Sequence, residues 1–105
     1  PIIAALQPLI DDLAEGRLDD IMAKGENGGL TKDELIGALR DYPGQISKQT
    51  VDPLRADIYE YVGQARRGGV EYDLVVDGVL SDLTLSCEYD LDRKPLLTIE
   101  SLHVL

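Results

Sequence analysis

Carboxylate and tyrosine side chains dominate the chemistry that the C-terminal half of this sequence could perform. From residue 57 onward there are ten carboxylates but only four basic residues, and these lie in segments that we predict to be turns: Arg66, Arg67, Arg93 and Lys94. The predicted strands therefore carry acidic charge with no Lys or Arg between. Like charges opposite each other on neighbouring strands repel by a few tenths of a kcal/mol to about 1 kcal/mol. The pattern favours a surface that attracts a basic partner; a solvated face that tolerates the repulsion is the alternative.

A set of candidate partner-binding residues follows from this pattern. Acidic side chains can steer association with a basic surface, and tyrosine is enriched among the residues that anchor interfaces. We predict that the partner-binding residues are Asp73, Asp77, Asp82 and Glu88, with Glu71, Tyr59 and Tyr61 beside them.

The segment from Glu26 to Leu35 resembles the second half of a calcium-binding EF-hand loop. Ala23 and Gly25 occupy the positions that should supply the first two carboxylates, so only Asn27 and Glu34 remain as side-chain ligands. Calcium takes 6–8 oxygen ligands, which this loop does not provide. We therefore expect no metal site here, and we assign Glu34 to a helix cap.

His103 and Cys87 are the single histidine and the single cysteine of the chain. His103 could act as a general base, but its place near the end of a strand favours a structural role. Cys87 alternates with Leu85 and Tyr89 on an apolar strand face and has no basic neighbour in sequence to lower its pKa. The sequence also lacks a glycine-rich phosphate loop, paired cysteines and a serine elbow. We expect a binding protein, not an enzyme, with no catalytic residue, metal or cofactor.

The overall charge narrows the choice of partner. The chain has 105 residues, with 20 acidic and 10 basic side chains and a formal net charge of −10. Charge of this sign repels nucleic acid and anionic membranes, whereas it attracts a basic protein, although it could also serve solubility alone. One cysteine allows no intramolecular disulfide, and the N-terminal apolar stretch has no basic residues ahead of it. We therefore expect a cytoplasmic protein without a signal peptide.

Residues 1–55 show the periodicity of helices. Apolar residues recur at spacings of three and four over residues 2–13 and again over residues 18–22, and Gly16 separates the two stretches. Thr31 and Glu34 have the spacing of a capping box, which predicts the start of a third helix. That helix should end at Tyr42, and a loop should follow over residues 45–55.

From Asp57 the period changes to two, which predicts strands. Turns are expected at Arg66–Gly69, at Asp77–Gly78 and at Asp90–Pro95. The four strands should cover residues 57–63, 70–77, 82–89 and 96–104. The sequence thus predicts one α+β domain over residues 1–105, with N-terminal helices packed on a curved four-stranded antiparallel meander sheet. Val75 breaks the alternation and the last strand shifts register near Ser101, so the pattern leaves open which sheet face is buried.

Four short motifs carry a resemblance to a known group: Thr31–Leu35, Tyr42–Gly44, Ser81–Leu85 and Leu102–Leu105. With its C-terminal S-D-L-T-L and L-H-V-L segments, the chain resembles a family of short, largely uncharacterised bacterial proteins. That family is similar to cone-shaped domains of the nuclear-transport-factor-2 type, in which helices pack on a curved sheet. Such domains often accompany secreted polymorphic toxins as immunity proteins. The resemblance implies this role and supplies no catalytic residues.

Three hypotheses about function remain. The first is an immunity protein that binds a toxin domain and covers its basic active-site cleft with an acidic surface. The second is a small-molecule-binding or catalytic cone-shaped domain with a pocket between helices and sheet, for which the candidate residues are His103, Tyr72 and Tyr89. The third is a subunit that pairs through a sheet edge.

Overall fold

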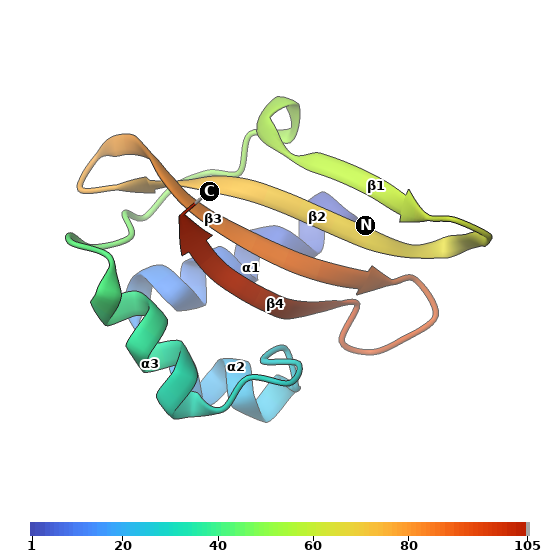
Figure 1. Cartoon of the computed structure of the whole chain (residues 1–105), viewed down its shortest axis with the longest axis horizontal. Coiled ribbons are helices and arrows are strands. Elements are labelled where there is room, and N and C mark those ends of the chain that lie inside the picture. Colours follow the sequence, from blue (N-terminus) through green and yellow to red (C-terminus); the bar gives the residue numbers. More distant parts are fainter. Residues whose placement is uncertain (105) are drawn as a thin grey trace.

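Three helices precede a four-stranded antiparallel sheet in the computed structural model, which describes residues 1–104 (Figure 1). The strands pair in the order β1-β2-β3-β4, so the predicted α+β meander is confirmed. Leu105, the end of the L-H-V-L motif, lies outside the described residues. The elements are α1 (Ile2–Glu15), α2 (Leu18–Lys24), α3 (Lys32–Asp41), the 3₁₀ turn η1 (Pro53–Arg55), β1 (Asp57–Tyr61), β2 (Gln64–Val76), β3 (Val79–Asp90) and β4 (Leu97–Val104).

The helices begin and end where local chemistry requires. Gly16 and Gly25 follow α1 and α2 in the left-handed region, with φ of 71° and 76°, where glycine carries no Cβ penalty. At the start of α3 the predicted capping box is present: Glu34 N donates to Thr31 Oγ1 at 3.1 Å, and Thr31 N donates to Glu34 Oε1 at 3.0 Å. Pro8 lies inside α1 and does not end it.

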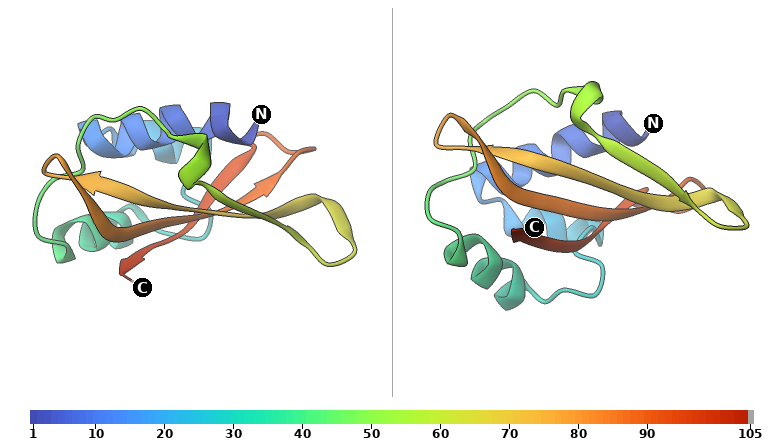
Figure 2. Two further views of the ribbon diagram at one scale, coloured as in Figure 1. Left: turned by 90° about the horizontal axis from the view of Figure 1, so that it is seen from above. Right: turned by 45° about the horizontal axis from the view of Figure 1, so that its top comes forward.

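Helix α1 covers one face of the sheet, whereas α3 lies beyond the β4 edge (Figures 1 and 2). The structure settles which face of the sheet is buried, a question that the sequence pattern left open. The buried residues are Val70, Tyr72, Leu74 and Val76 of β2, and Leu83, Leu85, Cys87 and Tyr89 of β3. Together with apolar residues of α1 they form one core cluster. The opposite face of the sheet has no helix over it, and we call it the open face. No helix within residues 1–104 is long and apolar enough to cross a membrane.

The β1–β2 hairpin differs from the prediction. The chain turns at Val62 and Gly63, where Gly63 has a φ of 76°, and not at Arg66–Gly69. The prediction of a turn there, with arginines confined to it, was wrong. Gly68 and Gly69 are strand residues, and the absence of a side chain at each leaves room for tyrosine rings from neighbouring strands. Arg66 and Arg67 consequently lie within β2.

Two irregularities in the ladder explain the breaks in the sequence pattern. The β2–β3 register shifts between Asp73 and Val75, and the β3–β4 register shifts opposite Glu100, which is the extra residue between Ile99 and Ser101. Such bulges re-aim the side chains that follow them. The predicted Asp77–Gly78 turn is confirmed, with both residues at positive φ.

A buried ionic cluster joins α1 to α2 and to the turn that follows α2. Asp12 is 5% exposed and accepts hydrogen bonds from Arg17 Nε at 2.8 Å and Lys24 Nζ at 2.9 Å. Burial pushes the pKa of Asp12 upward, but these two hydrogen bonds outweigh it, so the pKa lies below its ordinary value. Glu26 is 7% exposed, its Oε1 has no hydrogen-bond partner, and Lys24 Nζ stands 3.8 Å away. Burial raises the pKa of Glu26.

We predict that Glu26→Gln stabilises the protein at pH 7 by on the order of 1 kcal/mol, because it removes a poorly paired buried charge. The folded state holds the Glu26 proton more tightly than the unfolded chain does, so wild-type stability should fall as the pH rises from the ordinary glutamate pKa through the raised one. Urea unfolding between pH 4 and pH 8 should show this slope in the wild type and a flatter one in the variant.

Asp12→Asn provides the control of opposite sign. Its lowered pKa means that Asp12 contributes stability at neutral pH, which is lost as the pH falls. The variant should therefore be less stable than the wild type at pH 7. Equal slopes for the wild type and Glu26→Gln would contradict the assignment to Glu26.

Candidate functional site

The open face is built from the outward rows of all four strands. Strand register places Asp57 opposite Glu71, Asp73 opposite Thr84, and Glu88 opposite Thr98. Small residues occupy the middle of this face, where Gly69 and Ser86 are buried although no helix covers them. Larger side chains from the edges of the sheet therefore lie across its centre.

Tyrosines of β1 supply this cover. A Cβ at Gly69 would overlap the ring of Tyr59, which shows that the ring lies directly over this glycine. Tyr61 Oη lies 3.4 Å from Glu100 Oε1 on β4. Strands β1 and β4 are the two edges of the sheet, separated by three strand spacings or about 14 Å. The side chains of Tyr61 and Glu100 must therefore extend toward each other across β2 and β3.

The phenol groups remain neutral hydrogen-bond donors at neutral pH. Burial raises the pKa of Tyr59, and the nearby carboxylates Glu71, Glu100 and Asp57 raise it further. Burial followed by Glu100 and Glu88 has the same effect on the pKa of Tyr61. The two ring centroids lie 6.3 Å apart with planes tilted by 56°. The pair offers aromatic surface beside carboxylates, an environment that attracts cations.

Charge on the open face is unevenly compensated. Glu88 accepts from Arg67 Nη2 at 3.1 Å and from Arg93 Nη1 at 3.2 Å, so its charge is paired. This overturns the expectation that no arginine stands between the acidic residues of the strands. Asp57 and Glu71, in contrast, face each other across β1 and β2, and neither has a cationic partner within 4 Å in the described chain. The pair repels and leaves two carboxylates free for an external cation.

The structure divides the predicted partner-binding residues into two groups. Tyr59, Tyr61, Glu71, Asp73 and Glu88 share the open face, and Asp73 Oδ1 accepts from Thr84 Oγ1 at 2.7 Å.

Asp77 and Asp82 lie near the β2–β3 turn and make internal hydrogen bonds. Asp77 Oδ1 accepts from Gln45 N at 3.0 Å, and Asp82 Oδ1 accepts from Tyr42 Oη at 2.7 Å, a bond that raises the pKa of Tyr42. These two aspartates hold the segment after α3 against the sheet.

Sequence reasoning did not include Asp57 and Glu100 in the partner-binding set. Asp57 could have been found, because it precedes Tyr59 and Tyr61 in the same alternating row. Glu100 reaches the open face only because of the register shift opposite Ser86. The sequence indicates this shift only by a break in the alternation of apolar and polar residues.

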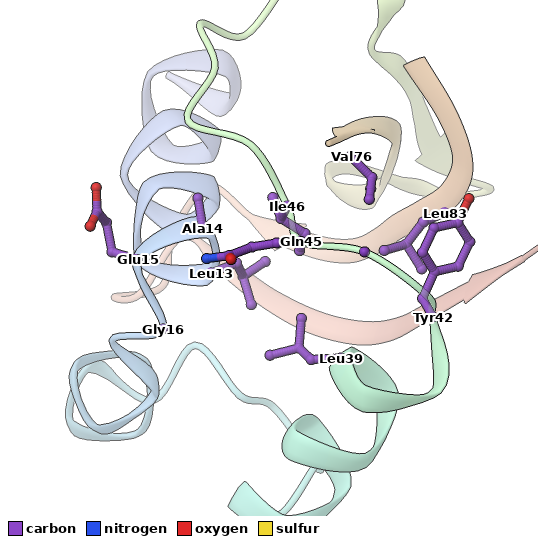
Figure 3. Close-up of a pocket in the computed structure, with 11 residues that line it drawn as sticks. Leu13, Ala14, Glu15, Gly16, Leu39, Tyr42, Gln45, Ile46, Val76 and Leu83 are labelled. Carbon is purple, nitrogen blue, oxygen red and sulfur yellow. The ribbon is translucent and has the colours of Figure 1, made fainter. Parts of the chain in front are cut away.

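A second candidate site is a cavity of about 330 Å³ between α1, α3 and the end of the sheet (Figure 3). Leu13 and Leu39 point into it, Val76 and Leu83 close it from the sheet, and Glu15 points away. Apolar side chains thus form most of the wall.

The three polar residues predicted for such a pocket do not line this cavity. Tyr72 and Tyr89 are buried in the core, and Tyr72 Oη accepts from Asp52 N at 2.9 Å. His103 lies on β4, where its Nδ1 is 2.8 Å from Ser101 Oγ.

Comparison with models of protein families gives a match over most of the chain. A family model described as a domain of unknown function, DUF7668, matches residues 10–105. No curated protein and no solved structure matches the chain.

We predict that Gly68→Ala destabilises the protein by about 1–3 kcal/mol, since the added methyl group overpacks a tight site. A Cβ at Gly68 would overlap the main-chain oxygen of Tyr59 and lie 2.7 Å from Tyr89 Oη, so β1 could not keep its place beside β2. Gly69→Ala is the matched control. The three atoms nearest to its added Cβ all belong to the Tyr59 side chain, which can rotate away, so this variant should be less costly. Urea unfolding and hydrogen exchange of the β1 amides test the difference, and an equal cost for both variants would contradict it.

Proposed function

We propose that this chain, which belongs to the DUF7668 family, is an immunity-type protein that binds and inhibits a basic toxin domain in the cytoplasm. The inhibition is stoichiometric. The open face covers the toxin's substrate-binding cleft, and the chain contributes no catalytic step. Nucleic acid and membranes are not its partners, because the net charge of −10 repels both.

The observation that carries the proposal is the unpaired like-charge pair of Asp57 and Glu71. Repulsion between the two carboxylates lowers the stability of the folded protein, and a lysine or arginine placed between them would reverse that loss. Tyr59 stands beside them on the same strand as Asp57, exposed by 42%, and provides aromatic surface for the apolar stem or the charge of such a residue.

The same features explain how the protein would recognise its target quickly. An excess of negative charge on a helix-free face accelerates encounter with a basic cleft, and the acceleration falls with ionic strength. A cleft that binds phosphate-bearing substrates is basic for its own chemistry, so an acidic cover occupies the place of the substrate.

A second candidate function rests on the cavity between α1 and α3. Its volume of about 330 Å³ lies within the usual range for small-molecule sites, and six of its eleven lining residues are aliphatic. Under this hypothesis the domain binds a small apolar molecule there.

For the first function we predict that reversing the open-face pair, as Asp57→Lys with Glu71→Lys, prevents capture of a basic partner from the organism's lysate and secreted proteins. Glu15→Lys with Asp20→Lys is the matched control, since it changes the net charge equally but lies on the helices. With the captured partner in stopped-flow association, the open-face variant should bind at least tenfold more slowly at low salt and show less salt dependence, whereas the control changes little. Equal effects of the two variants, or capture of nothing by the wild type, would overturn the proposal.

For the second function we predict saturable NMR shifts of the Leu13, Leu39 and Leu83 methyl groups on titration with indole. Leu39→Phe, which narrows the cavity while keeping its wall apolar, should abolish them. If no shift saturates up to the solubility limit of indole, the cavity hypothesis fails.

A further inference from the structure

A groove of about 420 Å³ runs between α3 and β4, at the edge of the sheet remote from β1. Apolar side chains form its floor, among them Ala38, Leu83 and Leu102, and the carboxylates of Glu34, Asp41 and Glu100 stand along it. In Figure 1 α3 lies beside the C-terminal part of β4 and leaves the front of the sheet uncovered.

Small residues on α3 keep this groove open. Gly37 and Ala38 both line it, and a Cβ at Gly37 would meet no atom within 4 Å. Glycine inside a helix costs about 1 kcal/mol relative to alanine. Helix α3 thus has a residue of low helix propensity at a position where a larger side chain would extend into the groove.

Backbone groups of β4 offer a place for another strand. β4 is an edge strand, and its outer edge makes one backbone hydrogen bond to another segment within residues 1–104, from Ile99 N to Glu26 O at 2.7 Å. From Ser101 to Val104 this edge faces the groove. An extended segment can pair with such an edge through main-chain hydrogen bonds.

The charge of the groove favours a basic occupant. Three carboxylates line it, and no lysine or arginine does among the described residues. None of the three has a lysine or arginine partner within 4 Å in the described chain, although Glu34 accepts a hydrogen bond from Thr31 N and Glu100 accepts a long one, 3.4 Å, from Tyr61 Oη. An acidic segment, such as most of this chain itself, would be repelled, whereas a basic one would gain ion pairs.

We propose that the groove takes an extended segment of the basic partner, which adds to β4 as a fifth strand. Its side chains alternate: one row packs on the apolar floor toward α3, and the basic row points to the open face, where Glu100 lies. The inference rests on the proposed function in one respect: the segment is taken to come from the basic partner. It extends that function by naming a recognition mode, strand addition with alternating apolar and basic residues, at a surface separate from Asp57 and Glu71.

A synthetic seven-residue peptide of alternating valine and lysine, capped at both ends, tests the groove without the partner. Titrated into ¹⁵N-labelled protein, it should shift the amides of Gly37, Ser101 and His103 in a saturable manner. The matched peptide of alternating valine and glutamate should shift none of them. Gly37→Leu should weaken binding of the lysine peptide at least tenfold, a loss of about 1.4 kcal/mol. Gly37→Ala, which improves the helix equally but fills little space, should change it less than twofold.

Gly37→Leu keeps the fold, since leucine favours the helix and meets free space, and circular dichroism would verify this. The groove proposal is overturned if neither peptide binds, if both bind alike, or if the lysine peptide shifts Tyr59 and Glu71 while Gly37→Leu has no effect. The last outcome leaves the open-face proposal standing. Conversely, reversal of the charges of Asp57 and Glu71 could leave capture of the partner unchanged while the lysine peptide still binds the groove. That result would overturn the proposed function but not the peptide site.

Discussion

Burial of the inner row of β2 and β3 is the constraint on which the rest of the structure depends. Side chains alternate between the two faces of a strand, so Val70, Tyr72 and Leu74 cannot be buried without placing Glu71 and Asp73 on the other face. A slip of one residue would bury these carboxylates, so the register is strongly specified. The acidic open face is thus a direct consequence of how the core is built.

Local rules written in the sequence account for most of the fold. The helix end at Gly16, the capping box at Thr31 and the turn at Asp77 each depend on neighbouring residues, and all three are present as predicted. The prediction failed at Gly68 and Gly69, where a glycine pair is typical of a turn. Their role depends on Tyr59 and Tyr89, which come from other strands, and no local pattern indicates such a contact.

The candidate site was less predictable than the fold, because it depends on pairing across strands. The sequence places Glu71, Asp73 and Glu88 in alternating rows, yet only the folded chain brings Arg67 and Arg93 to Glu88. The same holds for Asp77 and Asp82, whose carboxylates bond to residues 32 and 40 positions away along the chain. A count of acidic residues therefore overstates the charge available to a partner, and the unpaired carboxylates become identifiable only with the strand register.

Glu100 connects the two proposed surfaces. It faces Tyr61 across the open face, at 3.4 Å between Glu100 Oε1 and Tyr61 Oη, and it also lines the groove beside α3. A cation bound in the groove would draw the Glu100 carboxylate from the phenol, and a residue that displaced Tyr61 would free Glu100 for the groove. Binding at one surface would then change affinity at the other by the same factor in both directions, as thermodynamic linkage requires. A partner that fills both surfaces gains from this coupling, whereas one that fills a single surface does not. The shared carboxylate would thus favour a partner with both a basic cleft and an adjoining basic strand over proteins that are merely basic.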